Sequence, residues 1–331
     1  MKEKSVTVLI TVKNSARTIK DCIDSLLKLN YKNYKICVVD GFSTDGTYEI
    51  LKGYGKKIRL ERCGGNPPTA YNYAIKKINT EFIAFTDGDC IVDKNWLKNL
   101  VSSFESEDIG AVVGFCKTPK NVNFLQKLIG IELESRFKKF KKFISRGPTM
   151  NICVRTKIAK KLMFDERLDI SYDTDFGYRL IGLGRKILYQ PKALVYHHHR
   201  STIKSFIKQQ FIYGKFVPLL YFKHKKMAKG DHISKPIMVV QPFIFSLGSL
   251  SFLFSLFFPG LFYLGVLFFM FLFLVYLIDF LGLKTKKIYF FPYMVIFFLR
   301  TVSWCSGVLV FISKSIFKLF RSKKIRRVSG L

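Results

Sequence analysis

Acidic residues are scarce in this sequence of 331 residues, where 23 Asp and Glu stand against 55 Lys and Arg, giving a formal net charge of +32. Apolar residues are plentiful, since 49% of the chain is hydrophobic and its mean hydropathy is +0.16. Intrinsic disorder is therefore excluded, and the length exceeds the roughly 100–200 residues of one ordinary domain. The charge points to an anionic partner, either nucleic acid or an anionic membrane.

Closely spaced cysteine pairs are also missing, because no Cys-x-x-Cys occurs in the chain. This argues against a zinc site and against a disulfide framework. The seven cysteines are instead expected to be small buried hydrophobes: Cys22, Cys37, Cys63, Cys90, Cys116, Cys153 and Cys305. The first ten residues, MKEKSVTVLI, lead into a strand pattern with no separate apolar leader, so we expect the N-terminal part of the chain to be cytoplasmic.

Long apolar stretches decide between the two anionic partners. Residues 237–258 and 261–280 are nearly continuous Phe, Leu, Val and Ile, and only Pro259 and Gly260 separate them. Each reaches the roughly 20 residues that cross the hydrocarbon of a bilayer. The sequence therefore predicts a transmembrane hairpin in a multi-pass membrane protein, with anionic lipid rather than nucleic acid as the partner.

A third apolar segment, residues 288–313, is followed by a basic tail, residues 314–331, that has no acid. If the segment crosses the membrane once, the tail lies outside, against the usual excess of positive charge on the cytoplasmic side. If the segment re-enters or lies in the interface, the tail stays cytoplasmic, and the sequence leaves both arrangements open. Arg300 within the segment is costly in lipid, and Asp279 is its candidate partner.

The first part of the chain alternates short β-branched runs with helical patterns, which is typical of βαβ units and a mainly parallel sheet. The fold class is therefore α/β. Helices are expected at 16–29, 44–54 and 68–78, and strands at 5–12, 34–40, 58–63, 81–89 and 111–116.

Two further stretches are rich in both basic and aromatic residues. In residues 136–146, three Phe spaced three apart indicate a helix, either lying at the membrane interface or covering the core with a solvated lysine-rich face. Residues 181–200 resemble two strands around a proline turn. Residues 201–236 are predicted to be an interfacial, amphipathic linker into the membrane region, which spans 237–313.

The few acids are concentrated where strands end. Asp40 closes the second predicted strand, Asp87 and Asp89 follow the fourth, and Asp173 and Asp175 lie in SYDTDFGYRL. Two carboxylates one residue apart at a buried strand end can hold a hard divalent ion that keeps open positions for diphosphate oxygens. Asp-Gly-Asp is also common turn chemistry, so the motif alone leaves a surface turn open.

The order of these features resembles the family 2 glycosyltransferases, inverting enzymes of the GT-A fold. The motifs that carry the resemblance are VTVLITVKNSARTIKDCIDSLLKLNYKNYKICVVDGFSTDGT, TEFIAFTDGDCIVDKNWL, and the acceptor half from GPTMNICVRTK to YHHHRS. The resemblance implies a GT-A domain over residues 1–200, a nucleotide-diphosphate sugar as donor, and Mg²⁺ or Mn²⁺ as cofactor.

The resemblance also implies roles for single residues. Asp173 would be the catalytic base, Asp89 would bind the metal, Asp40 would contact the nucleotide base and Asp87 the ribose. The remaining donor-binding positions would be Val12, Asn14 and Asp45.

Supporting roles fall on residues near the end of this region. His197, in the run His197–His199, is a further metal ligand by its place in the family pattern, although the run also fits a polar strand end with one buried histidine. Asp175 would orient the base or cap the helix that follows. Arg200 would meet phosphate, and Gln210 and Tyr213 would form a lid over the donor.

The expected function is inverting, metal-dependent sugar transfer from a nucleotide-sugar to a hydroxyl of a lipid-linked glycan or glycolipid. The alternatives are a polyprenyl (dolichyl) phosphate glycosyltransferase and a non-catalytic membrane scaffold. The chain reads Gln210-Phe-Ile-Tyr-Gly where processive synthases of the family carry Gln-x-x-Arg-Trp, which argues against repeated polymerisation.

Overall fold

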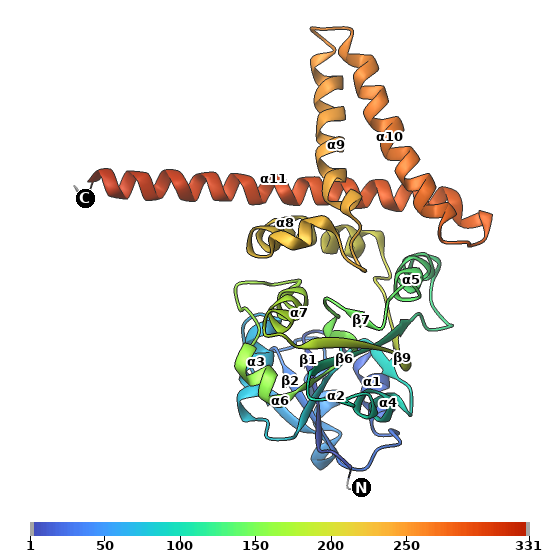
Figure 1. Ribbon diagram of the computed structural model, residues 1–331, viewed down its shortest axis with the longest axis vertical. Coiled ribbons are helices and arrows are strands. Elements are labelled where there is room, and N and C mark those ends of the chain that lie inside the picture. Colours follow the sequence, from blue (N-terminus) through green and yellow to red (C-terminus); the bar gives the residue numbers. More distant parts are fainter. Residues whose placement is uncertain (1–2, 329–331) are drawn as a thin grey trace. The chain divides into compact units, whose positions relative to one another are not determined.

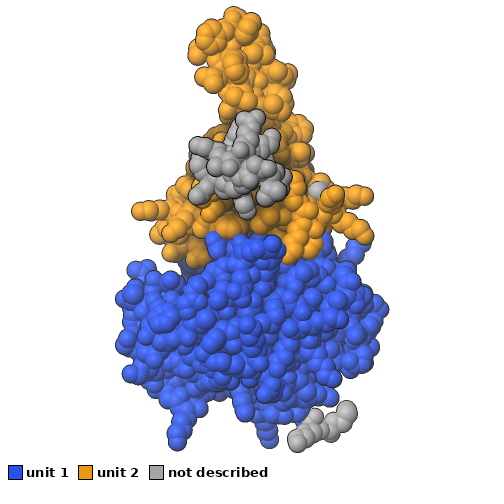
Figure 2. All heavy atoms as spheres, turned by 90° about the vertical axis from the view of Figure 1, so that its left-hand side faces the viewer, with its two compact units in different colours: residues 1–199 blue, residues 200–331 orange. Residues whose placement is uncertain are grey.

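The computed structural model describes residues 3–328. The chain divides into two compact units, residues 1–199 and residues 200–331 (Figure 2). The first unit is a sheet with helices against both faces, and the described part of the second is built from helices (Figure 1).

The first unit follows the predicted alternation of strands and helices closely in its first half. Its strands are β1 (Val6–Val12), β2 (Tyr34–Asp40), β3 (Arg59–Arg62), β4 (Phe82–Phe85), β5 (Cys90–Val92), β6 (Ile109–Lys117), β7 (Phe143–Ile144), β8 (Ile152–Arg155) and β9 (Lys186–His197). Its helices are α1 (Ile19–Leu26), α2 (Thr47–Lys52), α3 (Pro67–Lys77), α4 (Trp96–Ser102), α5 (Phe124–Phe137), α6 (Thr156–Leu162) and α7 (Tyr172–Gly182). Short 3-10 turns occupy Gly55–Lys57 and Thr149–Asn151.

The strands form one sheet in the order β3-β2-β1-β4-β8-β6-β9-β5, with β7 pairing to β9. The predicted α/β class is confirmed, and β3, β2, β1 and β4 are parallel neighbours. The other half is mixed rather than mainly parallel, because β8 runs antiparallel to β4 and β6, and β5 runs antiparallel to β9. Strands β6 and β8 are buried almost continuously, a pattern more typical of parallel strands, so their apolar runs gave no sign of this reversal.

The core lies on both faces of the sheet because side chains alternate along each strand. Val8 and Ile10 of β1 pack in one cluster with Ile23 of α1, and Leu9 packs in a second cluster with Tyr71 and Ile75 of α3. Six of the seven cysteines are buried as expected, and Cys63 is half-buried.

The prediction of a helix over residues 136–146 is wrong. Helix α5 ends at Phe137, a turn follows, and Phe143 begins the short strand β7. Phe137 is buried and Phe140 packs edge-on against Tyr189 with ring centroids 5.1 Å apart. Phe137 and Phe140 therefore pack in the core of the first unit, whereas Phe143 is exposed on β7.

The two strands expected in residues 181–200 are one continuous strand, β9. Pro191 lies where the register with β6 shifts between Gly114 and Phe115, so its missing N–H falls at an irregularity. A Cβ on Gly114 would overlap the carbonyl oxygen of Ala193, so the close approach of the two strands here requires glycine.

The second unit contains two long helices joined by a tight turn, and a still longer helix near the C-terminus (Figure 1). Its helices are α8 (Ile203–Lys223), α9 (Pro236–Phe254), α10 (Leu261–Leu281) and α11 (Phe290–Val328), with 3-10 turns at Lys225–Lys229 and Lys287–Tyr289. Three segments are long and apolar enough to cross a membrane among the described residues: Pro236–Phe254, Leu261–Leu281 and Lys287–Ser315.

Two features of this region were not expected from the sequence. The basic stretch from residue 314 continues helix α11 as far as Val328, and residues 329–331 of the predicted tail lie outside the described residues. Asp279 forms an ion pair with Lys235, and the guanidinium of Arg300 lies over the rings of Phe297 and Trp304.

Candidate active site

The parallel half of the sheet brings three polar loops to one edge. Strands β1, β2 and β4 are neighbours and run in the same direction. The loops that follow them carry Asn14, Asp45 and Asp87. Ligands of open α/β sheets bind outside the carboxyl ends of strands, so this edge is the candidate site.

The loops after β1 and β2 are fastened to each other. The backbone N–H of Asn14 donates to Ser43 Oγ at 2.9 Å, and the N–H of Thr44 donates to Asn14 Oδ1 at 2.9 Å. Asp45 accepts from the N–H of Ala16 at 3.0 Å, and the carbonyl of Val12 accepts from Gly41 at 2.8 Å. Three of the predicted donor residues, Val12, Asn14 and Asp45, thus shape the backbone here.

Asn14 and Phe42 in these loops both have positive φ, 55° and 58°. Backbone in this region is costly for residues other than glycine and is concentrated at functional sites. The structure holds both loops in this conformation through the hydrogen bonds between them.

Asp40 lies in the same place but is completely buried. Its carboxylate accepts from the N–H of Ser43 at 3.2 Å and from Arg62 Nε at 3.2 Å. The Arg62 guanidinium lies over the rings of Phe42 and Tyr48, 4.6 and 4.2 Å from their centroids. The accessible groups beside Asp40 are therefore Arg62 and Phe42, which the sequence analysis missed. The signal that could have found them is the parallel pairing of β2 with β3, because it brings the ends of both strands to one edge of the sheet.

The Asp-Gly-Asp segment after β4 closes against the end of β1. A Cβ on Gly88 would lie 2.7 Å from Val12 Cγ1, so this approach needs glycine. The hydroxyl of Tyr71 lies 3.4 Å from Asp87 Oδ1. Burial, with the negative charges of Asp89 and Asp173, raises the pKa of Asp87 to about 7.

Asp89 faces a histidine from a distant part of the chain. Strand β5 pairs with β9 so that Cys90 is opposite His197, and His197 Nε2 lies 3.4 Å from Asp89 Oδ1. The ligand atoms of Asp89, Cys90 and His197 all lie within 4.8 Å of one another. Burial, with the charge of Asp89, raises the pKa of the Cys90 thiol well above its ordinary value, and hard divalent ions prefer carboxylate oxygen and imidazole nitrogen to a thiol.

A carboxylate and an imidazole together fit a divalent ion such as Mn²⁺, since both are donors that such ions accept. Burial disfavours the charged form of His197, but the adjacent Asp89 outweighs it and the pKa of His197 stands well above its ordinary value. The negative charge of Asp89 therefore stabilises a positive charge at this position, which also favours the binding of a cation.

The three histidines of residues 197–199 have different surroundings. His199 is buried, its Nδ1 lies 3.1 Å from His197 Nδ1, and its Nε2 lies 3.2 Å from Thr118 Oγ1. Burial and the neighbouring His197 charge lower the pKa of His199 to about 3, so it is neutral. His198 meets this group through its backbone N–H, which donates to the Asp89 carbonyl at 3.0 Å. His197 therefore faces Asp89 through its Nε2 atom, and His199 contacts the Nδ1 atom of His197.

Asp173 opens helix α7, after Ser171 in a left-handed conformation with φ 61°. Its Oδ1 accepts from the N–H of Thr174 at 2.7 Å, and Arg146 Nη1 donates to Thr174 Oγ1 at 2.8 Å. Burial raises the pKa of Asp173, although the charge of Arg146 opposes the shift. Because Asp173 contributes to the raised pKa of Asp87, its charge acts on the Asp-Gly-Asp segment.

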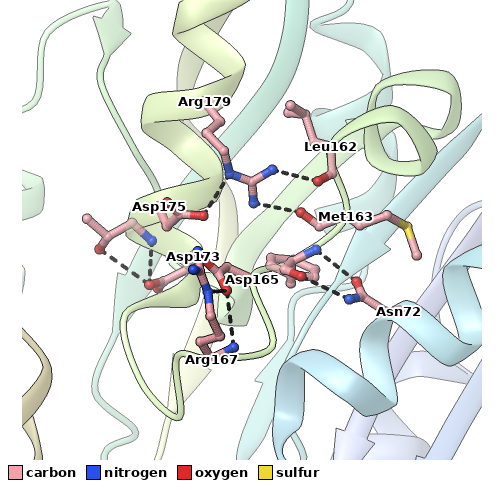
Figure 3. Close-up of polar contacts among 10 residues, drawn as sticks. Asn72, Leu162, Met163, Asp165, Arg167, Asp173, Asp175 and Arg179 are labelled. Atoms are coloured by element: carbon pink, nitrogen blue, oxygen red, sulfur yellow. Dashed lines mark hydrogen bonds and ion pairs between the residues drawn. The ribbon is translucent and has the colours of Figure 1, made fainter. Parts of the chain in front are cut away.

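Asp175, two residues later, is completely buried and pairs with Arg179 Nε at 2.7 Å (Figure 3). Arg179 also donates to the carbonyls of Leu162 and Met163 at 2.5 and 2.6 Å. Sequence reasoning favoured a helix cap for Asp175. The structure instead uses it to fasten α7 to the end of α6, because the i,i+4 spacing places Arg179 on the same helix face.

The segment between α6 and α7 is fixed at a second point. The Asn72 side chain of α3 donates to the Phe164 carbonyl at 2.9 Å and accepts from the Phe164 N–H at 2.8 Å. Asp173 is thus carried on a helix start that is tied to both α3 and α6.

The predicted supporting residues Arg200, Gln210 and Tyr213 belong to the second unit. There Gln210 is buried and accepts a hydrogen bond from Trp304 Nε1 at 3.0 Å. The structure therefore assembles Asp87, Asp89, Asp173 and His197 within the first unit, and the roles of Arg200, Gln210 and Tyr213 toward a donor stay predictions.

Replacing Gly177 of α7 by alanine should destabilise the protein, although alanine normally favours a helix by up to about 1 kcal/mol over glycine. The added Cβ would lie 2.7 Å from Arg146 Cα, so α7 would have to move away, at a cost of about 1–3 kcal/mol. Thermal unfolding of the full chain measures the effect. Gly182→Ala is the matched control, since a Cβ there meets nothing within 4 Å; equal melting temperatures for the two variants would contradict the prediction.

Comparison with known proteins agrees with this geometry. Residues 7–168 match the model of glycosyl transferase family 2. The chain is 27% identical over 209 residues to an uncharacterized glycosyltransferase of Rickettsia typhi, covering 60% of this chain and 63% of that protein. It is 24% identical over 276 residues to a dolichyl N-acetyl-alpha-D-glucosaminyl phosphate 3-beta-D-2,3-diacetamido-2,3-dideoxy-beta-D-glucuronosyltransferase of Methanococcus voltae, covering 77% of this chain and 82% of that protein.

Among solved structures, a mannosyltransferase of Pyrobaculum calidifontis in complex with GDP-Man and Mn²⁺ aligns with a TM-score of 0.52 and 16% identity, over 66% of this chain and 65% of that chain. This similarity shows the fold. The family model and the relatives named as glycosyltransferases favour an enzyme over the scaffold alternative. The chain therefore carries a domain of the GT-A fold whose residues 7–168 match glycosyl transferase family 2.

Proposed function

We propose that this chain transfers a single sugar from a nucleotide-diphosphate sugar to a hydroxyl of a lipid-linked glycan or glycolipid, with inversion at the anomeric carbon. The observation that carries the proposal is the pair Asp89 and His197 on the same unit as Asp173, a half-buried carboxylate whose pKa is raised. The pair provides a place for a cation, and Asp173 provides a base.

Asp173 would accept the proton of the acceptor hydroxyl as the oxygen attacks the anomeric carbon and the bond to the diphosphate breaks. A raised pKa makes a carboxylate a stronger base, which favours this proton transfer. One base is enough for a single displacement, whereas retention through a covalent intermediate would need a second carboxylate as nucleophile.

Asp89 and His197 would hold Mg²⁺ or Mn²⁺, which supplies charge stabilisation for a leaving diphosphate. The solved mannosyltransferase of the same fold contains Mn²⁺, which supports a divalent cation in this chain. Asn14, Asp45 and the Arg62–Phe42 pair, at the ends of β1, β2 and β3, would surround the nucleotide.

Membrane association supports the lipid-linked acceptor. Three described segments are long and apolar enough to cross a membrane, and the Methanococcus relative carries a dolichyl phosphate-linked sugar in its name. We propose that the hairpin anchors the chain as a multi-pass protein with the first unit on the cytoplasmic side, beside anionic lipid.

The test is a transfer assay with the purified full chain in lipid nanodiscs. UDP- and GDP-sugars are supplied with Mn²⁺ or Mg²⁺, and the acceptor is either polyprenyl phosphate or a lipid-linked saccharide. We expect product with inverted anomeric configuration on the saccharide, and only with metal present. Product on bare polyprenyl phosphate alone would replace this proposal by the polyprenyl phosphate alternative, and no product with any pair would contradict both.

A further inference from the structure

The three apolar segments of the second unit do not have equivalent surroundings. Length and composition alone do not separate a helix that crosses a membrane from one that lies in its surface. The contacts within this unit do separate them.

Helices α9 and α10 pack along each other. A Cβ on Gly248 of α9 would lie 2.9 Å from the Phe269 ring, and one on Gly265 of α10 would lie 2.8 Å from the Phe252 ring. The side chains around their turn are apolar and exposed, including Leu256, Phe257 and Tyr263 at 78%, 74% and 73%. A paired hairpin with an apolar outer surface of this kind fits a crossing of the bilayer.

Helix α11 crosses α9 near the middle of that helix, where the Phe298 ring lies against Phe245 with centroids 5.9 Å apart, and contacts α10 near its C-terminal end. Cys305 lies 3.1 Å from Ser246 of α9, and Thr301 is hydrogen-bonded to Tyr276 of α10 at 2.5 Å. The Tyr293 ring packs on Phe280, close to the end of α10. Figure 1 shows α11 running across the hairpin rather than along it.

Helix α8 lies alongside α11 in backbone contact. A Cβ on Gly214 would lie 2.7 Å from Trp304 Cα, and one on Gly307 would lie 2.7 Å from the Lys215 nitrogen. Gln210 bonds Trp304, and Phe222 stacks on Phe311 with centroids 6.3 Å apart. Residues later in α8 contact residues later in α11, so the two helices lie side by side and run in the same direction.

Helix α8 is unsuited to the hydrocarbon of a bilayer. It is 21 residues long, but it is not among the helices apolar enough to cross, because four lysines are distributed from its first turn to its last: Lys204, Lys208, Lys215 and Lys223. Lysine is among the most costly residues at the centre of a membrane. A crossing α11 would bring this helix into the membrane beside it.

We infer that α8 and α11 form a helix pair that lies in the surface of an anionic membrane, and that only α9 and α10 cross it. The inference depends on the proposed membrane anchoring and not on the sugar-transfer reaction. The pair places its lysines among lipid phosphates, and the apolar exposed face of α11, which carries Phe291, Val295 and Leu309, meets the acyl chains.

This arrangement keeps the C-terminal end of α11 on the side of α8, which directly follows the first unit. The basic residues after residue 313 then lie on that same side, as the charge distribution of membrane proteins requires. In this arrangement Arg300 lies where α11 crosses the hairpin, between Phe298 and Cys305, which contact α9.

Variants with one accessible reporter cysteine test the topology in a Cys63→Ser background, in which the six remaining cysteines are buried. Gly260→Cys reports the hairpin turn, where a Cβ meets nothing within 4 Å, Lys286→Cys reports the connection to α11, and a cysteine appended after Leu331 reports the C-terminus. A membrane-impermeant maleimide is added to sealed vesicles of either orientation, and the Cys63→Ser chain without a reporter gives the background.

We expect Gly260→Cys to react from one side, and both Lys286→Cys and the C-terminal cysteine only from the other. A C-terminal cysteine on the side of Gly260→Cys would mean that α11 crosses, and would overturn the inference. Reaction of Gly260→Cys and Lys286→Cys from the same side would instead overturn the proposed hairpin anchoring.

Spin labels on the exposed face of α11 provide a measurement that does not depend on vesicle orientation. Labels at Phe291, Val295, Phe298, Leu309 and Ile312 cover residues 291–312, or about 32 Å of helix at 1.5 Å per residue. In bilayers with anionic lipid, we expect similar oxygen accessibility, and thus similar depth, at all five. A maximum of depth in the middle of the series would show a crossing helix.

Discussion

Replacing Asp173 by asparagine should reduce sugar transfer by about 10²–10⁴-fold, the contribution expected of a positioned general base. Asparagine keeps the side-chain volume and can still accept a hydrogen bond from the Thr174 N–H, which Asp173 accepts at 2.7 Å. It cannot take a proton from the acceptor hydroxyl. Turnover at saturating donor and acceptor, measured on the purified full chain, gives the size of the loss.

Asp169→Asn is the matched control for this variant. Asp169 lies four residues earlier in the same connection to α7, is exposed, and accepts from Asn66 Nδ2 at 3.1 Å. We expect its turnover to stay close to that of the unaltered chain. Unchanged turnover in Asp173→Asn would remove Asp173 from the reaction.

Replacing Asp89 by alanine should remove the divalent cation and lower transfer by about 10²–10³-fold, equivalent to several kcal/mol of charge stabilisation. Asp89 provides the carboxylate that lies 3.4 Å from His197 Nε2. Without it, the imidazole would be the remaining donor of the pair. Titration with Mn²⁺, followed by the loss of the free-ion electron paramagnetic resonance signal, measures the binding independently of activity.

Asp93→Asn tests whether a nearby negative charge alone explains cation binding. Asp93 follows Asp89 by four residues, and its Oδ1 accepts from the N–H of Asn95 at 2.9 Å at the start of α4. Asparagine can keep this bond, so both Mn²⁺ affinity and transfer should be retained. Equal Mn²⁺ affinity in Asp89→Ala and Asp93→Asn would place the cation elsewhere.

The first half of the fold was predictable because β1, β4 and most of β2 are buried, and helices separate the parallel strands along the chain. The predicted strand 34–40 is β2, with the same limits, and the predicted strand 5–12 differs from β1 by one residue. Both have runs of β-branched or apolar residues of strand length, for which the local pattern is sufficient.

The second half was less predictable because its pairings are long-range. The spacing of Phe137, Phe140 and Phe143 indicates a helix, yet the first two rings pack on the sheet and the third begins β7. Pro191 indicates a turn, but it is accommodated at a register shift within β9. In both cases a tertiary contact outweighs the local signal.

The candidate site shows the same division. Asp87 and Asp89 could be proposed from their places after a strand, whereas the roles of Asp173 and His197 came from the family resemblance. The distance between Asp89 and His197 could not be predicted, because it depends on the pairing of β5 with β9. Arg62 was missed because an arginine at a strand end is not distinctive in a chain with 55 basic residues.

The central claim is that the cation site and the base are separate parts of one reaction centre. The most direct test is the dissociation constant of the nucleotide-sugar donor, measured by calorimetry with Mn²⁺ for Asp173→Asn and Asp89→Ala on the preparations used for turnover. We predict an unchanged constant for Asp173→Asn, and one at least about tenfold weaker for Asp89→Ala. Donor binding lost in Asp173→Asn and kept in Asp89→Ala would contradict the account.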